Sequence, residues 1–336
     1  MKDLRQLLPL VLTLAACTAD GGPLEAQDGL TGTLVVTNKA AANASIIDVA
    51  SGRILATIRT GDGPHEVAMT ADGSLAVVTD YGGQGGGQTL TVIDVPGRRV
   101  ARTIDLGEHR RPHGIAFLPG DSLVAVTSEV SGHVVIVNPS DGGIRKAIPT
   151  EHDGSHMLTF GAQADRIYTG DIGSNTVSEL DVAAGRYVRS FDVPREPEAV
   201  GMPLDGREVW VGSNAEGKVS VIDPSTGAVR TAAEGFGWPY RIVFTPDGGT
   251  VLLPDLEREV LRVLERDGFA EIARLEFAGA APQGIVVTPD GAYAFQSLSR
   301  QDRLAVIDLT TFAVVRSIAT GPGPDGVAYT TRVVTN

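Results

Sequence analysis

One polar position that recurs seven times along the chain carries the side chains best suited to chemistry. Each copy lies in a short unit that is rich in glycine and proline and contains an aliphatic residue, such as GPHEV, RPHGI or APQGI. In chain order, the residues at this position are His65, His113, His156, Glu198, Tyr240, Gln283 and Asp325. All seven are polar, and three consecutive copies hold half of the six histidines of the chain. Because imidazole and carboxylate groups bind metals and transfer protons, this set is the candidate functional site.

The three consecutive histidines predict a transition-metal site, provided that the fold brings their side chains to one point. His65, His113 and His156 would supply three nitrogen ligands, and Glu198 would be the fourth ligand. Three protein nitrogens with one open position form a catalytic zinc arrangement, and imidazole suits copper as well. A structural interpretation competes with this one, because polar side chains at such a position also hydrogen-bond neighbouring loops or channel water. Sequence spacing does not decide between the two.

Further residues around the repeated position bear on catalysis and on ligand binding. A lactonase-like or lyase-like activity would use His156 and Glu198 as the acid–base groups. Aromatic residues gather at the fifth copy, GFGWPY, where Trp238 and Tyr240 would either stack on a planar or sugar-like ligand or pack a loop. The candidate ligand-binding residues are therefore His65, His113, His156, Glu198, Trp238, Tyr240, Gln283 and Asp325.

The same repeated unit indicates the architecture that must position these residues. Its second residue falls at positions 64, 112, 155, 197, 239, 282 and 324, so successive copies lie 48, 43, 42, 42, 43 and 42 residues apart. The one long interval contains a glycine-rich insertion, GGQGGGQ, at residues 82–88. A period near 42 residues is typical of the blades of a β-propeller.

Each copy of the repeat contains four short strand signals separated by turns. The first strand ends at a turn such as Pro246-Asp247-Gly248, and the third carries a Val-Ile-Asp signature. We therefore predict an all-β fold, a seven-bladed β-propeller of four-stranded antiparallel blades. N- and C-terminal strands would share one blade and so close the ring. Two copies of Val-Val-Thr-Asn, at residues 35–38 and 333–336, compete for one strand of that blade.

Short sequence motifs of the repeat resemble those of a known family. Val36-Thr37-Asn38 and Val334-Thr335-Asn336, with the Val-Ile-Asp and Pro-Asp-Gly units, are similar to those of the YVTN-repeat β-propellers, which include YncE-like periplasmic proteins. The resemblance covers residues 33–336 and implies the propeller fold, but it implies no particular activity. Single copies depart from the pattern, since Gly161-Ala162-Gln163 replaces Pro-Asp-Gly in one of them.

The N-terminal segment predicts export and lipid anchoring. Residues 1–16 combine early positive charge with an apolar run, LLPLVLTLAA, that is too short to span a bilayer. The run ends in Leu-Ala-Ala-Cys, which resembles the lipobox of bacterial lipoproteins and implies lipidation of Cys17. Because threonine follows this cysteine, the resemblance implies the periplasmic face of the outer membrane. Residues 17–31 would form a flexible tether, and residues 32–336 the propeller.

Composition and missing motifs exclude several classes of function. A formal charge of −13 disfavours nucleic-acid binding, and a single cysteine leaves no disulfide or cysteine metal site in the body. Serine-hydrolase elbow, c-type haem and nucleotide-binding motifs do not occur. One interpretation is a monomeric binding or scaffold lipoprotein that presents channel-mouth loops to an envelope protein or a small-molecule ligand. The other is a metal-dependent envelope enzyme of lactonase, lyase or redox type, which the lack of a catalytic motif disfavours.

Overall fold

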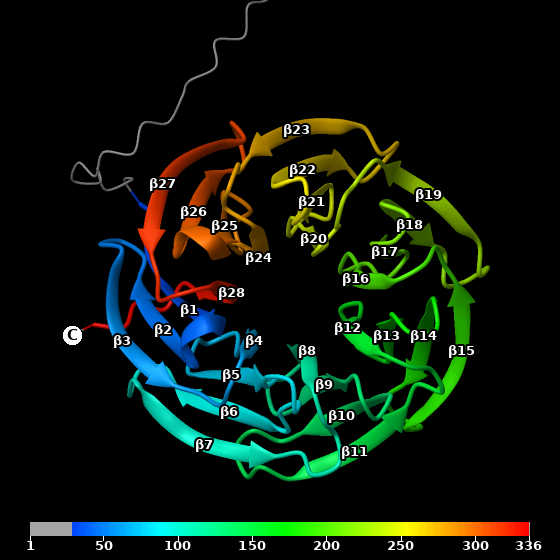
Figure 1. Ribbon diagram of the computed structural model, residues 1–336, viewed down its shortest axis with the longest axis horizontal. Helices are drawn as coiled ribbons and strands as arrows, with labels where there is room; N and C mark the ends of the chain where they lie inside the picture. The colour runs from blue at the N-terminus through cyan, green and yellow to red at the C-terminus, as the bar shows by residue number, and fades with distance from the viewer. Residues whose placement is uncertain (1–28, 336) are drawn as a thin grey trace, which may run out of the picture.

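The chain forms a ring of seven four-stranded antiparallel sheets, and this confirms the predicted seven-bladed β-propeller (Figure 1). The computed structural model describes residues 29–335. We number the blades around the ring from the one that contains the first strand of the chain. Within each blade one strand lies closest to the ring axis and another lies at the rim.

The four strands of a blade follow one another from the axis to the rim. From blade 1 to blade 7, the innermost strands are β28 (Pro324–Thr330), β4 (Pro64–Met69), β8 (Pro112–Phe117), β12 (Ser155–Thr159), β16 (Pro197–Gly201), β20 (Val243–Phe244) and β24 (Pro282–Val287). The second strands are β1 (Thr33–Asn38), β5 (Leu75–Asp80), β9 (Val124–Ser128), β13 (Arg166–Asp171), β17 (Val209–Ser213), β21 (Thr250–Asp255) and β25 (Tyr293–Leu298). The third strands are β2 (Asn43–Asp48), β6 (Thr89–Asp94), β10 (His133–Val137), β14 (Thr176–Asp181), β18 (Lys218–Ile222), β22 (Val260–Glu265) and β26 (Arg303–Asp308). The outermost strands are β3 (Arg53–Arg59), β7 (Arg99–Asp105), β11 (Ile144–Pro149), β15 (Arg186–Asp192), β19 (Val229–Glu234), β23 (Glu271–Glu276) and β27 (Ala313–Ala319).

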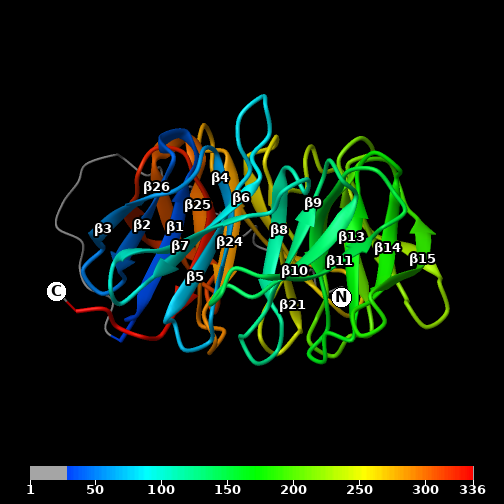
Figure 2. The same ribbon diagram turned by 90° about the horizontal axis from the view of Figure 1, so that it is seen from below.

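The loops between the strands lie on the two faces of the ring (Figure 2). Two of them contain single turns of 3₁₀ helix, η1 (Lys39–Ala41) and η2 (Ser299–Gln301). The loop between β5 and β6, which contains the glycine-rich insertion, projects furthest from one face. Arg110 holds this loop, since its guanidinium donates a hydrogen bond to the carbonyl of Gly85 at 2.7 Å.

The apolar core lies between the faces of neighbouring blades, and alternation along the strands builds it. In β1, Leu34 and Val36 pack into the cluster shared with blade 7, whereas Val35 packs into the cluster shared with blade 2. Successive side chains of a strand point to opposite faces, so a strand covered on both faces carries apolar residues at successive positions. This is why the middle strands of the blades appear in the sequence as short continuous apolar runs.

Strands from both ends of the chain close the ring in blade 1. β1 pairs antiparallel with β28, with Val35 opposite Ala328 and Val36 opposite Val327, and it pairs with β2 on its other side. The N-terminal copy of Val-Val-Thr-Asn therefore occupies the contested strand. Residues 333–335 of the C-terminal copy lie outside the sheet, where Val334 is buried and its backbone N–H donates to Thr33 Oγ1 at 3.1 Å.

Blade 6 departs from the other blades at its innermost strand. β20 spans only two residues, and ahead of it Pro239 forms an isolated bridge to Asp255. The buried Asp255 carboxylate accepts hydrogen bonds from the backbone N–H groups of Gly237 and Trp238, at 2.9 and 2.8 Å. This carboxylate fixes the aromatic loop where regular strand pairing is missing.

The predicted signal peptide and the lipidation site Cys17 lie outside the described residues. At the end of the predicted tether, Leu30 is buried between blades 1 and 7, and the carbonyl of Thr31 accepts a hydrogen bond from Tyr329 Oη at 2.7 Å. The last residues of the predicted tether thus pack against the propeller. Within residues 29–335, no helix has the length and apolar character needed to cross a membrane.

A buried carboxylate in blade 2 gives the fold a pH dependence. Asp80 is 1% exposed and accepts hydrogen bonds from Gly61 N and from the hydroxyls of Thr89 and Thr91. Burial raises the pKa of Asp80 to about 6, although these hydrogen bonds oppose the shift. The folded state therefore retains a proton that the unfolded chain releases at lower pH. The stability that this proton contributes is lost as the pH rises through about 6.

We expect the Asp80→Asn variant to lose this contribution to the pH dependence. Between pH 4 and pH 7, the difference in unfolding free energy between variant and wild type should move by roughly 2–3 kcal/mol in favour of the variant. Urea unfolding followed by circular dichroism at several pH values measures this difference. Stability curves that run parallel for the two proteins would contradict the raised pKa.

Candidate functional site

A pocket of about 710 Å³ lies at the mouth of the ring where the innermost strands begin. Six of the seven residues at the repeated polar position line this pocket, namely His65, His113, His156, Glu198, Tyr240 and Gln283. The seventh, Asp325, is fully buried beside His65. In every blade except blade 6, this residue is the second of the innermost strand, so the fold sets equivalent side chains in one circle.

A second circle of lining residues comes from the position directly after the second strand in six of the seven blades. These residues are Lys39, Tyr81, Glu129, Ile172, Asn214 and Leu256. In an antiparallel pair, the end of one strand lies beside the start of its neighbour. The end of each second strand therefore meets the start of the innermost strand at the same mouth, and both circles surround one pocket.

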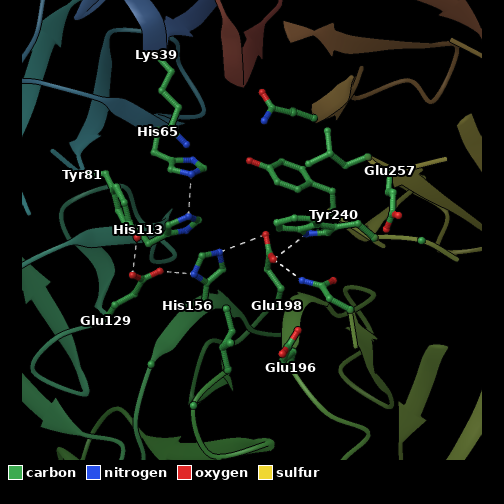
Figure 3. Close-up of a pocket in the computed structure, with 18 residues that line it drawn as sticks. Lys39, His65, Tyr81, His113, Glu129, His156, Glu196, Glu198, Tyr240 and Glu257 are labelled. Atoms are coloured by element: carbon green, nitrogen blue, oxygen red, sulfur yellow. Dashed lines mark hydrogen bonds and ion pairs between the residues drawn. The ribbon is translucent and has the colours of Figure 1, made fainter. Parts of the chain in front are cut away.

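His65, His113 and His156 lie in a row along one side of the pocket (Figure 3). The Nε2 atoms of His65 and His113 are 3.1 Å apart, and the rings of His113 and His156 lie face to face with centroids 3.6 Å apart and their planes inclined by 33°. Burial and the neighbouring imidazoles hold the pKa of His113 well below its usual value, so His113 is neutral. Its Nδ1 atom is buried and has no hydrogen-bond partner among the described residues.

His156 is held between two carboxylates. Its Nδ1 contacts Glu129 Oε1, and its Nε2 lies 3.4 Å from Glu198 Oε1. Burial would lower the pKa of His156, but the two glutamates raise it to about 9, so the side chain is an imidazolium at neutral pH. Tyr81 Oη donates to Glu129 Oε2 at 2.7 Å and accepts from Arg111 at 3.1 Å. Tyr81, Glu129 and His156 thus form one hydrogen-bonded chain.

Trp238 and Tyr240 supply the aromatic part of the pocket, and Tyr240 faces the histidine row (Figure 3). Trp238 Nε1 and Asn214 Nδ2 both donate to Glu198 Oε2, at 2.8 and 2.5 Å. Tyr240 Oη donates to Asp325 Oδ1 at 3.1 Å. The indole of Trp238 is fixed by its single donor and yet 38% exposed, so it offers a rigid apolar surface to a ligand.

An ion pair crosses the ring one residue further along the innermost segments. The guanidinium of Arg241, which is 5% exposed, contacts Glu66 of blade 2 and lies 3.9 Å from Glu198 of blade 5. It also covers the ring of Tyr240, with Cζ 4.0 Å from the centroid. Burial would raise the pKa of Glu66, but Arg241 and His65 lower it to about 2. The pair therefore joins blades on opposite sides of the ring.

Some residues of the site were not among the sequence candidates. Lys39, Glu129 and Asn214 share one repeat position, and comparison of that position across the seven copies would have found them. Glu66 and Arg241 follow the polar circle directly, where the other copies carry glycine, alanine or methionine. Opposite charges at one repeat position are a signal for a contact across the ring.

The atoms that could hold a metal fall into two groups. His65, Glu66 and His113 form one group, and His113, Glu129 and His156 form the other. Within each group the ligand atoms lie within 4.8 Å of one another, and His113 belongs to both groups. The three histidines do not form such a group by themselves among the described residues. Metal binding by all three together with Glu198 stays a prediction.

The fold and the pocket define a class, a seven-bladed β-propeller with a histidine-rich pocket at one mouth. No protein-family model matches the chain. Among curated proteins, the chain is similar to Protein NirF of Pseudomonas aeruginosa strain PAO1, with 23% identity over 362 aligned positions that cover 96% of this chain and 86% of NirF.

Solved structures show the same architecture. Hydrazine synthase of Kuenenia stuttgartiensis matches with a TM-score of 0.68 and 19% identity, over 79% of this chain and 88% of that chain. The periplasmic gluconolactonase PpgL of Pseudomonas aeruginosa matches with a TM-score of 0.72 and 15% identity, over 91% of this chain and 100% of that chain. At these identities the likeness establishes the propeller fold. Membership of the YVTN-repeat family stays a prediction from the short motifs of the repeat.

We expect the Arg241→Met variant to be strongly destabilised, because it leaves the largely buried Glu66 carboxylate without its guanidinium partner. Removal of one member of a buried ion pair costs about 3–5 kcal/mol, which urea unfolding at pH 7 would measure. The double variant Glu66→Gln/Arg241→Met should recover much of this loss, since no unpaired charge stays buried. A double variant as unstable as the single one would contradict this assignment to the ion pair.

Proposed function

We propose that the protein is a small-molecule-binding β-propeller that holds one sugar-like ligand, a polyhydroxylated ring, in the channel-mouth pocket. The observation that carries this proposal is the exposed indole of Trp238 beside a dense set of hydrogen-bonding side chains. A sugar ring presents an apolar C–H face and a circle of hydroxyl groups. An aromatic surface suits the face, and convergent polar groups suit the hydroxyls.

The size and lining of the pocket support a small ligand. Its volume of about 710 Å³ lies within the range of roughly 300–1,000 Å³ that is typical of small-molecule sites. The exposed carboxylates of Glu196 and Glu257 on its wall accept hydrogen bonds from hydroxyl groups. Inside, the side-chain oxygens of Asn214 and Gln283 are buried without a hydrogen-bond partner among the described residues, so a ligand would satisfy them. The protein-scaffold interpretation gains no comparable support.

A place in the cell envelope completes the proposal. The predicted signal peptide and the predicted lipidation of Cys17 support export and anchoring at the periplasmic face of the outer membrane. A structurally similar propeller carries the name of a periplasmic gluconolactonase, which supports a periplasmic setting by analogy. In this proposal the propeller is a monomer that captures its ligand at the membrane surface.

Tryptophan fluorescence tests the binding proposal, because Trp238 lines the pocket whereas Trp210 is fully buried in the core. Titration with D-glucono-1,5-lactone, gluconate or glucose should produce a saturable change in emission. Calorimetry with the responding probe should show binding about tenfold weaker in Trp238→Ala, since the stacking surface is lost. Leu204→Ala, in the turn between β16 and β17 and away from the pocket, should match the wild type. Absence of saturable binding for all three probes would reject the proposal.

Hydrolysis of such a ligand is a second candidate function, and the chain of Tyr81, Glu129 and His156 favours it. A carboxylate that orients an imidazolium, and a third group that orients the carboxylate, would place a proton donor, a general acid, in the pocket. Tyr81, Glu129 and His156 also line the pocket, where a bound ligand would contact them.

In that case the protein should hydrolyse D-glucono-1,5-lactone faster than buffer does, as followed by pH-stat. Glu129→Gln removes the charge that orients His156 and should lower kcat by about 100-fold or more. Tyr81→Phe keeps the carboxylate and should lower kcat less. Saturable binding of the lactone without turnover would reject hydrolysis and leave the binding proposal intact.

A further inference from the structure

The histidine pair at the boundary of blades 2 and 3 has the geometry of one edge of a metal coordination sphere. The Nε2 atoms of His65 and His113 face each other at 3.1 Å, and the side chains are 6% and 0% exposed. Two metal–nitrogen bonds of about 2.0–2.1 Å place the nitrogens about 2.9 Å apart at a right angle and about 3.3 Å apart at a tetrahedral angle. The observed separation lies between these values.

We propose that His65 and His113 bind a divalent transition-metal ion of the zinc type through their Nε2 atoms. Both histidines belong to one of the two groups whose ligand atoms lie within 4.8 Å of one another. The third member of that group, Glu66, lies 3.4 Å from His65 Nδ1 and is paired with Arg241, so we do not assign it as a ligand. Imidazole nitrogen is a common ligand for zinc. This site is independent of the sugar-like ligand proposed above, although both would share one pocket.

A buried carboxylate behind His65 supports the assignment of Nε2 as the metal-binding atom. Asp325 Oδ2 lies 3.0 Å from His65 Nδ1, off the ideal hydrogen-bond direction, and Asp325 is fully buried. Tyr240 Oη and Lys39 Nζ hold the same carboxylate, at 3.1 and 3.3 Å. A carboxylate next to one ring nitrogen of histidine favours a proton there, which leaves the lone pair on the other nitrogen for a metal.

His156 is not part of the proposed site, which narrows the set of three histidines predicted from the sequence. Both of its nitrogens face carboxylates, Nδ1 that of Glu129 and Nε2 that of Glu198. Its ring stacks on His113 and does not point at the gap between His65 and His113. Both histidines line the pocket, so water or a substrate from the pocket would complete the coordination.

Metal content of the purified protein tests the site. After incubation with zinc sulfate and dialysis, elemental analysis should find one zinc per wild-type chain. His65→Gln and His113→Gln should each lower the affinity, measured by calorimetry, by more than 100-fold. Asp325→Asn should lower it by about 10–100-fold at unchanged stoichiometry, since it removes the group behind a ligand. His133→Gln, which alters a histidine outside the pocket, should bind zinc as the wild type does.

Two outcomes would overturn the proposal. Wild-type protein that retains no zinc, even when zinc sulfate is in excess, excludes the site without any variant having to fold. Loss of zinc in His156→Gln together with retention in His65→Gln would move the ion to the other ligand group. The anomalous signal of zinc in wild-type crystals provides an independent readout, and it should lie between the two Nε2 atoms.

Discussion

The antiparallel pairing of β1 with β28 is the contact on which the rest of the structure depends. A row of stacked blades leaves a free face at each end, and only a closed ring covers both and turns all seven innermost strands toward one axis. The pairing also brings Lys39, Asp325 and His65 together at the boundary between blades 1 and 2. Contacts between the two ends of the chain thus become contacts within the site.

The pocket concentrates buried charge, and its arrangement explains how the fold tolerates this. The imidazolium of His156 lies between the carboxylates of Glu129 and Glu198, and Arg241 is paired with Glu66. An unpaired buried charge would be costly, whereas these groups alternate in sign. The members of each ion pair come from different blades, so the charged side chains of the pocket also connect distant parts of the ring. The side-chain oxygens of Asn214 and Gln283, which have no partner among the described residues, belong to side chains that line the pocket.

The fold could be predicted from the sequence because its signals are local and repeated. A period of about 42 residues, turn residues at fixed offsets and apolar runs each report on one blade, and seven copies average out single departures. The circle from His65 to Asp325 followed from the same repeat. Distances within the circle could not be predicted, because small tilts decide whether neighbouring imidazoles stack or converge. The partner Glu129 was missed because its repeat position carries lysine, tyrosine, isoleucine, asparagine, leucine or serine in the other blades, so no shared residue type marks it.

Departures from the repeat mark where the symmetric ring becomes an asymmetric site. Blade 6 shortens its innermost strand, and Asp255 compensates by fixing the loop that carries Trp238. The next residues supply Tyr240 and Arg241, which contact Asp325 of blade 1 and Glu66 of blade 2. This irregular segment thus carries the exposed Trp238 and the cation of Arg241 within four residues. The loss of regular pairing in one blade is therefore coupled to the aromatic and charged groups that shape the pocket.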